Sequence, residues 1–307
     1  MASLRDIRNR IASVRNTQQV TRAMKMVAAA KLRRAQEAIF AARPYAYKMG
    51  EIISHLKSQL DPTSHPLIQP RGESRAVLLI VVTSDRGLAG AFNSNLIKLA
   101  EQTIRERFGD LHASGNVTLV CVGKKCHDHF RKRGYRLVGN FRGVFDNLTF
   151  DVARDVSKLA REGYEADEWD EVHLIYNEFR NTIAQNRIVE PLLPIPAEQF
   201  LTPVMEDEVH RDANVKEGAH IDYIFEPGAQ HILEALIPLY LGYEVWRALL
   251  ESNAAEQGAR MVAMDSATNN ADELLSNLRL KYNRARQDAI TRELIEITSG
   301  ADALEAS

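Results

Sequence analysis

The sequence predicts a mixed α/β protein in which two long terminal helices pair as an antiparallel two-helix coiled coil around an inserted α/β domain. Three observations carry this prediction. Proline is absent after Pro238, and Gly258 is the only glycine between Gly242 and Gly300. Residues 3–43 contain neither proline nor glycine. Between these two ends, patterns typical of buried strands alternate with patterns typical of amphipathic helices.

The C-terminal helix is expected within residues 227–307. Pro227 can occupy its first turn, and Pro238 is expected to kink it. At a rise of 1.5 Å per residue, the stretch from Gly242 to Gly300 would be roughly 80 Å long. Apolar or small residues recur along it in alternating steps of four and three, which is the pattern of a coiled-coil seam. The seam positions are Leu250, Ala254, Gln257, Met261, Met264, Thr268, Ala271, Leu275, Leu278, Tyr282, Ala285 and Ala289.

The N-terminal helix is expected within residues 1–60, with Ser3 as its N-cap, Asp6 in its first turn and a bend at Pro44. A second seam runs along it with the same alternation. Because each seam needs a long partner to exclude water, we expect the two helices to pair with each other. The seam positions are Leu4, Ile7, Ile11, Val14, Gln18, Thr21, Lys25, Ala28, Leu32, Ala35, Ile39 and Ala42.

The inserted domain is expected over residues 75–205, after a proline-containing linker. Its strands and helices alternate, which favours a largely parallel, Rossmann-like sheet, with a hairpin joining the last two strands. An acidic connecting segment, residues 206–226, follows the domain. The expected strands are 75–83, 117–122, 171–177 and 186–193, and the expected helices are 91–108, 126–132 and 147–161.

Composition restricts the class of protein. The 307 residues suffice for about two domains, and 39 basic against 41 acidic residues do not mark a nucleic-acid binder. The two cysteines, Cys121 and Cys126, indicate no disulfide framework and suit a reducing compartment. No run of 18 or more apolar residues occurs, so a membrane-spanning helix is not expected. The N-terminus resembles neither a signal peptide nor a transit peptide.

The turn Ser84–Gly90 follows a buried strand and opens a helix, where a phosphate cradle would lie in a nucleotide-binding fold. It contains only G-x-x-G, without the G-x-G-x-x-G order or the lysine of a P-loop. We therefore interpret it as a tight turn.

Two other candidate sites are weaker. Cys126, His127 and His129 lack a second ligand pair at a metal-site spacing, so a solvated helix face is expected. The basic side chains of the first helix have no interleaved aromatic residue before Phe40, which argues against single-stranded nucleic-acid binding. We expect no catalytic residues, no cofactor and no metal site in this chain.

Four blocks of sequence resemble the gamma subunits of F-type ATP synthases, and the resemblance covers nearly the whole chain. Ala89 and Ala91 depart from it, because cysteine and glycine are common there in relatives. The order of two terminal helices around an α/β insert is also that of the family. The blocks are residues 7–31 (IRNRIASVRNTQQVTRAMKMVAAAK), 84–93 (SDRGLAGAFN), 256–271 (EQGARMVAMDSATNNA) and 282–303 (YNRARQDAITRELIEITSGADA).

The resemblance implies a central rotor shaft. It implies that the coiled coil lies inside a hexamer of alpha and beta subunits. The opposite end of the shaft, its foot, would rest on a membrane ring of c subunits, and the epsilon subunit would lie against the α/β domain. Catalysis would belong to the beta subunits, and rotation would couple proton flow to ATP synthesis. By resemblance, outward-facing residues contact the beta subunits: Met24, Arg260, Gln287, Thr291, Glu293 and Glu296. Tyr223 and Glu226 match the foot on the c-ring.

The resemblance also implies a peripheral place on the cytoplasmic side of a bacterial inner membrane. Two alternatives from other classes stay open. A nucleotide-binding enzyme would bind ATP at the Ser84–Gly90 turn. A coiled-coil scaffold or nucleic-acid protein would self-associate or show steeply salt-dependent DNA binding.

Overall fold

A computed structural model describes residues 4–59, 65–69, 71–196, 200–206 and 228–305. The protein divides into two compact units. The first unit combines residues 1–27 with residues 261–307, and the second comprises residues 28–260. Two helices run through both units: α1, Leu4–Gln59, and α7, Ala229–Glu305. Residues 207–226 of the acidic segment, which include Tyr223 and Glu226, lie outside the described residues.

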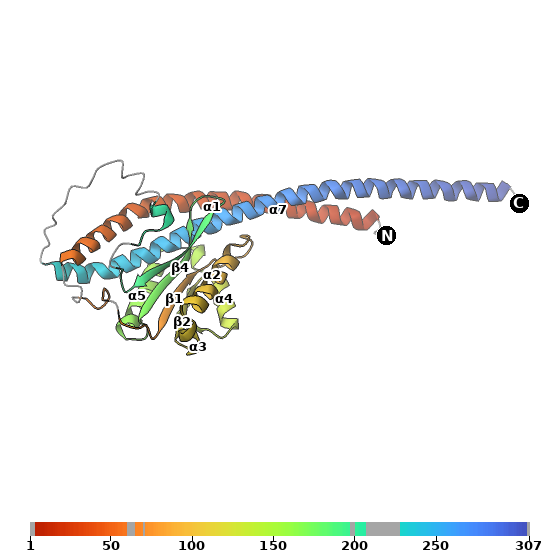
Figure 1. The fold of residues 1–307 in the computed structure, drawn as a ribbon. Coiled ribbons are helices and arrows are strands. Elements are labelled where there is room, and N and C mark those ends of the chain that lie inside the picture. Colours follow the sequence, from red (N-terminus) through yellow and green to blue (C-terminus); the bar gives the residue numbers. More distant parts are fainter. Residues whose placement is uncertain (1–3, 60–64, 70, 197–199, 207–227, 306–307) are drawn as a thin grey trace. The chain divides into compact units, whose positions relative to one another are not determined.

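The second unit is built on a five-stranded sheet with the order β3-β2-β1-β4-β5. Strands β1 to β4 are parallel, and β5 pairs antiparallel with β4 as the predicted hairpin (Figure 1). The predicted α/β fold is therefore confirmed. The strands are β1, Val77–Val82; β2, Val117–Val122; β3, Arg136–Leu137; β4, Glu171–Phe179; and β5, Gln185–Leu193.

Five shorter helices with defined bounds accompany the sheet, and the described residues 203–206 are helical as well. Three match the predicted helices to within a few residues at each end. The short α3 and the two-residue β3 were not predicted, because such short elements carry no detectable hydrophobic period. The helices are α2, Phe92–Arg107; α3, Gly109–Ala113; α4, Lys124–Lys132; a 3-10 turn, Val144–Asp146; and α5, Phe150–Glu165.

The two faces of β1 enter different cores, because successive side chains of a strand point to opposite faces. Leu78, Ile80 and Val82 pack in a core with α5, the first part of α7, and Met49 and Ile53 of α1. Val77, Leu79 and Val81 pack in the other core with α2 and α4. Both faces of the central strand are therefore buried, which explains its continuous apolar sequence.

The first unit is an antiparallel pair of helical segments from the two ends of the chain. Along α1, the side chains partly shielded from water include Ile7, Ile11 and Val14, which are members of the predicted seam. Along α7 the shielded seam positions continue to Ala285, and Ala289 is exposed. Both helices pass through a proline without interruption, at Pro44 and Pro238. The predicted coiled coil is thus confirmed.

Candidate functional site

Four polar pairs cross the seam of the first unit. As the α1 member advances by ten, three and four residues, its partner on α7 recedes by ten, four and three. The four pairs therefore share one antiparallel register. The pairs are Arg8 Nη2 with Tyr282 Oη at 3.0 Å, Gln18 Nε2 with Asp272 Oδ1, Thr21 Oγ1 with Thr268 Oγ1 at 2.8 Å, and Lys25 Nζ with Asp265 Oδ1 at 2.6 Å.

The buried threonine pair is the part of this seam that specifies register. Thr21 and Thr268 are both buried, and their hydroxyl groups share a hydrogen bond. Apolar seam residues tolerate sliding, whereas displacement breaks the hydrogen bond between the two hydroxyls and leaves each bonded only to a carbonyl of its own helix. Lys25 and Asp265 are half-exposed, so their ion pair adds less stability. We call the Thr21–Thr268 hydrogen bond the register mark of the first unit, because it fixes the register that the apolar packing alone leaves free.

Beyond the seam, α7 presents exposed side chains around its whole circumference. Gln287, Thr291 and Glu293 are exposed, as are apolar residues such as Leu294. Four residues correspond to little more than one helical turn, so Gln287 and Thr291 share a face, while Glu293 lies on another. Glu296 belongs to α7, but its side chain lies outside the described residues. These predicted contact residues do not form one patch.

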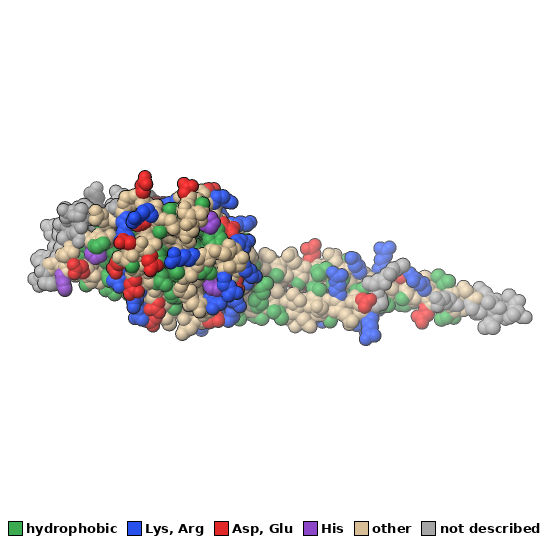
Figure 2. All heavy atoms as spheres, turned by 90° about the horizontal axis from the view of Figure 1, so that it is seen from below, with side chains coloured by type: hydrophobic (Ala, Val, Ile, Leu, Met, Phe, Trp, Pro, Cys, Tyr) green, Lys and Arg blue, Asp and Glu red, His purple; other side chains and the backbone are tan. Residues whose placement is uncertain are grey.

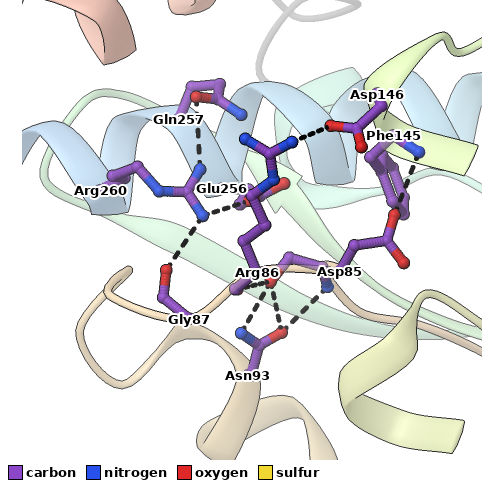
Figure 3. A network of polar contacts seen from close by, with 10 residues as sticks. Asp85, Arg86, Gly87, Asn93, Phe145, Asp146, Glu256, Gln257 and Arg260 are labelled. Carbon is purple, nitrogen blue, oxygen red and sulfur yellow. Dashed lines mark hydrogen bonds and ion pairs between the residues drawn. The ribbon is translucent and has the colours of Figure 1, made fainter. Parts of the chain in front are cut away.

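Met24 and Arg260 belong to different units. Met24 is half-buried beside the seam of the first unit. Arg260 was expected to face outward, and this orientation is wrong, because its side chain is only 11% exposed. Its guanidinium forms an ion pair with Glu256 at 2.6 Å and donates to the Gly87 carbonyl at 3.2 Å (Figure 3). A role of Arg260 in contacting a beta subunit stays a prediction.

The loop Ser84–Gly90 reaches α7 through this arginine. Burial raises the pKa of Glu256, while the ion pair with Arg260 opposes that shift. On the other side of the loop, Arg86 forms an ion pair with Asp146 at 2.7 Å. The loop is therefore attached both to α7 and to the segment that precedes α5 (Figure 3).

Internal hydrogen bonds fix the conformation of the Ser84–Gly90 loop. The Asp85 carboxylate accepts backbone N–H bonds from Lys124, the first residue of α4, at 2.8 Å and from Gly143 at 2.7 Å. Asn93 Oδ1 accepts the N–H of Ser84 at 2.9 Å. A helix N-terminus attracts anions, and Asp85 is such an anion at α4, whereas α2, the helix that the loop opens, has no side-chain cap. The geometry agrees with the interpretation as a tight turn.

Leu88 is the exposed tip of the same loop. Its φ of 63° lies in the left-handed region, which is uncommon for a leucine. Its side chain is 67% exposed. The surrounding hydrogen bonds hold the loop in this conformation.

A second attachment of α7 to the sheet was not predicted. Arg247 of α7 lies fully buried with Glu244 of the same helix, Glu190 of β5 and Tyr176 of β4. We call these four residues the Arg247 cluster. The available signal was charge inside two apolar runs: two charged residues in YEVWRALL on the helix and one in IVEPLL on the strand. Sequence alone could not show that these charges meet.

Burial and charge oppose each other in the Arg247 cluster. Burial raises the pKa of Glu190 to about 7, while the Arg247 guanidinium acts to lower it. Burial acts to lower the pKa of Arg247, and the neighbouring acidic groups raise it well above its ordinary value. The pKa values of Arg247 and Glu190 therefore both lie above their ordinary values.

The other candidate sites of the sequence are the cysteines with their neighbouring histidines and the basic face of the first helix. Among the described residues, no group of three or more His, Cys, Asp or Glu side chains could hold a metal ion. Cys121 and Cys126 are both free and buried. On the face of the second unit seen in Figure 2, acidic and basic side chains are interspersed. Within the described ranges, no helix is both long and apolar enough to cross a membrane.

Comparison with known proteins decides the family. A family model described as ATP synthase matches residues 3–304. The chain is 64% identical to the ATP synthase gamma chain of Salinibacter ruber over 307 residues, which cover 100% of both chains. The chain belongs to the ATP synthase gamma chains. The gamma chain of Chloroherpeton thalassium is 50% identical, again with 100% of both chains covered.

Solved structures agree with the fold of this gamma chain family. The central stalk and c-ring structure of the Tetrahymena thermophila mitochondrial ATP synthase contains a chain that is 25% identical, with a TM-score of 0.54. That match covers 81% of this chain and 99% of the other. A chain of the Euglena gracilis mitochondrial ATP synthase is 19% identical with a TM-score of 0.64, covering 99% and 95%. At that identity the likeness concerns the fold alone.

Proposed function

We propose that this gamma chain is the rotating central shaft of the complex and carries no catalytic site of its own. The observation that best supports the proposal is the coiled coil of the first unit. Its apolar seam and buried Thr21–Thr268 hydrogen bond join two helices in one register. Two joined helices resist twisting better than one, and torsional stiffness is what a shaft requires.

The load on such a shaft sets the stiffness it needs. Moving one proton through 100 mV releases about 2.3 kcal/mol, so several protons together deliver on the order of 10 kcal/mol for each ATP. This energy is comparable with the whole folding stability of a small domain. The shaft must therefore transmit it without rearranging its own packing.

The partners follow from the same proposal. The exposed end of α7 would turn inside a hexamer of alpha and beta subunits, the epsilon subunit would bind the sheet-bearing unit, and a c-ring would hold the foot. The apolar side chains near Leu294 suit a bearing, because hydrophobic contact is non-directional. Polar residues such as Gln287, Thr291 and Glu293 suit directional contacts with the beta subunits. Contacts of Met24, Arg260 and Glu296 with the beta subunits, and of Tyr223 and Glu226 with the c-ring, belong to the proposal too.

We also propose that the catalytic sites lie on the beta subunits. The chain itself would be a peripheral subunit on the cytoplasmic side of a bacterial inner membrane. The Ser84–Gly90 loop supports the first point, because the side chains of Asp85 and Asn93 are bonded within the chain, to the N–H groups of Lys124 and Ser84. Membership of the gamma chain family supports the second. Isolated chain that binds ATP tightly would contradict the first point.

Co-purification is the first test. The tagged chain, expressed in its own cells, is expected to bring down alpha and beta subunits with one copy of itself per complex. A chain recovered alone, or as a homo-oligomer, would contradict the shaft proposal.

The contact role of Glu293 has a sharper test. Glu293→Ala is expected to reduce the number of protons pumped per ATP hydrolysed in reconstituted vesicles, because a directional contact with a beta subunit is lost. The helicity of the isolated chain, read by circular dichroism, should not change. Glu273→Ala is the matched control, since Glu273 is also an exposed acid of α7. Equal pumping in the two variants would refute the assignment of Glu293.

A further inference from the structure

The Arg247 cluster joins α7 to the sheet through a directional set of contacts. Arg247 Nη2 donates to both oxygens of Glu190, at 2.6 and 2.8 Å. Arg247 Nη1 donates to Tyr176 Oη at 2.8 Å, and this hydroxyl donates to Glu190 Oε2 at 2.8 Å. Glu244 Oε2 accepts from Nε at 3.1 Å and from Nη2 at 2.7 Å. Two strands and one helix therefore meet at one planar guanidinium.

Two further contacts follow one helical turn later on the same helix. Glu251 Oε2 accepts the backbone N–H of Phe179, the last residue of β4, at 3.0 Å. Ser252 Oγ donates to the carbonyl of Val82, the last residue of β1, at 3.4 Å. The helix is thus bonded to β1, β4 and β5 within six consecutive residues.

Stability alone does not explain this cluster. Its neighbours on α7 include Leu241, Val245 and Leu249, which are buried and apolar. Burying charges costs several kcal/mol per ion before their mutual attraction is counted, and an apolar replacement of the same volume is often as stable. Apolar contact has little angular preference. A guanidinium fork bound to a carboxylate does have one, because its N–H groups are planar and fixed in direction.

We propose that Arg247, Glu190, Tyr176 and Glu244 set the rotation of α7 about its own axis on the sheet, so that torque applied to the sheet-bearing unit turns α7 without slip. This inference rests on the proposed shaft function. The four are positioning residues, since they act on the helix and touch no substrate. Apolar packing holds the helix against the sheet, and the cluster fixes the angle at which it is held.

An all-apolar variant separates angle from stability. Tyr176→Phe, Glu190→Leu, Glu244→Leu and Arg247→Met are introduced together, which removes every polar atom of the cluster. The melting temperature is expected to stay the same or to rise. Arg247→Met alone is expected to be strongly destabilised, because two buried carboxylates lose their partner.

The angle is read in the full isolated chain by spin labels at Leu239→Cys on α7 and Arg131→Cys on α4, both exposed positions. Cys121 and Cys126 stay in place, since both are buried. The all-apolar variant is expected to show a broader distance distribution than the parent chain. This readout does not depend on rotation in the complex.

Asp170→Asn is the matched control. Asp170 is a buried acid of the same unit, and its carboxylate accepts the N–H of Arg75 at 2.8 Å, away from α7. This variant is expected to lose stability while keeping the parent distance distribution. If the distance distribution broadens only because stability falls, it will broaden in Asp170→Asn as well. That result would overturn the inference.

The functional readout is the number of protons pumped per ATP hydrolysed by the reconstituted complex. The all-apolar variant is expected to lose coupling although it folds. The inference is overturned if the all-apolar variant keeps the parent width of the distance distribution. It is also overturned if this variant pumps as many protons per ATP as a normal parent complex. A parent complex that does not pump at all refutes the shaft function instead, so the two failures are distinguishable.

Arg247→Lys keeps the inference testable if the all-apolar variant does not fold. Lysine retains the charge but is a point charge without the planar fork. A broader distance distribution at nearly parental stability is expected. A distribution of parental width in Arg247→Lys overturns the inference as well.

Discussion

The loop Ser84–Gly90 depends on one carboxylate, and Asp85→Ala removes it. Asp85 accepts the N–H groups of Lys124, Gly143 and Phe145 at 2.8, 2.7 and 3.2 Å. A hydrogen bond to a charged group contributes about 1.5–3 kcal/mol when both partners are buried. Lys124 and Gly143 are exposed, so water replaces part of that contribution. We expect the free energy of unfolding to fall by about 2 to 4 kcal/mol in total.

The assay is urea unfolding followed by tryptophan fluorescence. Trp169 is buried in the sheet-bearing unit, so its emission reports the relevant transition. Asp85→Asn keeps one acceptor oxygen and is expected to lose less stability than Asp85→Ala. Asp110→Ala is the control at an exposed acid of α3. An Asp85→Ala chain within about 0.5 kcal/mol of the parent, the range of ordinary surface substitutions, would refute the reasoning.

Three further predictions concern packing, pH and register. A Cβ at Gly163 would lie 2.0–2.6 Å from ring atoms of Trp169, so Gly163→Ala should cost about 1–3 kcal/mol and red-shift the fluorescence; an unshifted spectrum would contradict this. The pKa of Glu190 is raised to about 7 from 4.5. The folded state therefore gains stability from protonated Glu190 below pH 4.5, and this stability is lost as the pH rises through 7. Relative to Glu190→Gln, the parent should lose stability on the order of 3 kcal/mol over that interval; parallel pH profiles would contradict this. Thr21→Val should cost about 1 kcal/mol in thermal melts read by circular dichroism, and adding Thr268→Val should recover it; a double variant less stable than the single would argue against the register mark.

The coiled coil could be predicted from sequence because its signal is periodic. Every third or fourth residue along α1 and α7 is apolar or small, and most of these positions are shielded in the structure. The polar members Gln18, Thr21 and Lys25 looked like an interruption of the seam. In the structure they join the two helices through hydrogen bonds and an ion pair, because each contacts a polar partner on α7.

The attachments between α7 and the sheet could not be predicted, because they depend on tertiary contacts distant in sequence. Arg260 was expected to face outward because, by resemblance, it matches a position that contacts the beta subunits. The structure instead places the Gly87 carbonyl against it, and no local period encodes where that loop lies. Arg247 and Glu190 were visible only as isolated charges in apolar runs, which is a signal of burial but not of pairing.

Rotation itself is the most direct test of the shaft function. A fluorescent bead is attached through Lys132→Cys, at an exposed position of α4, in a complex whose alpha and beta subunits are fixed to a surface. Addition of ATP is expected to turn the bead continuously in one direction, and an inhibitor of ATP hydrolysis is expected to stop it. A bead that stays fixed while the complex hydrolyses ATP would contradict the account.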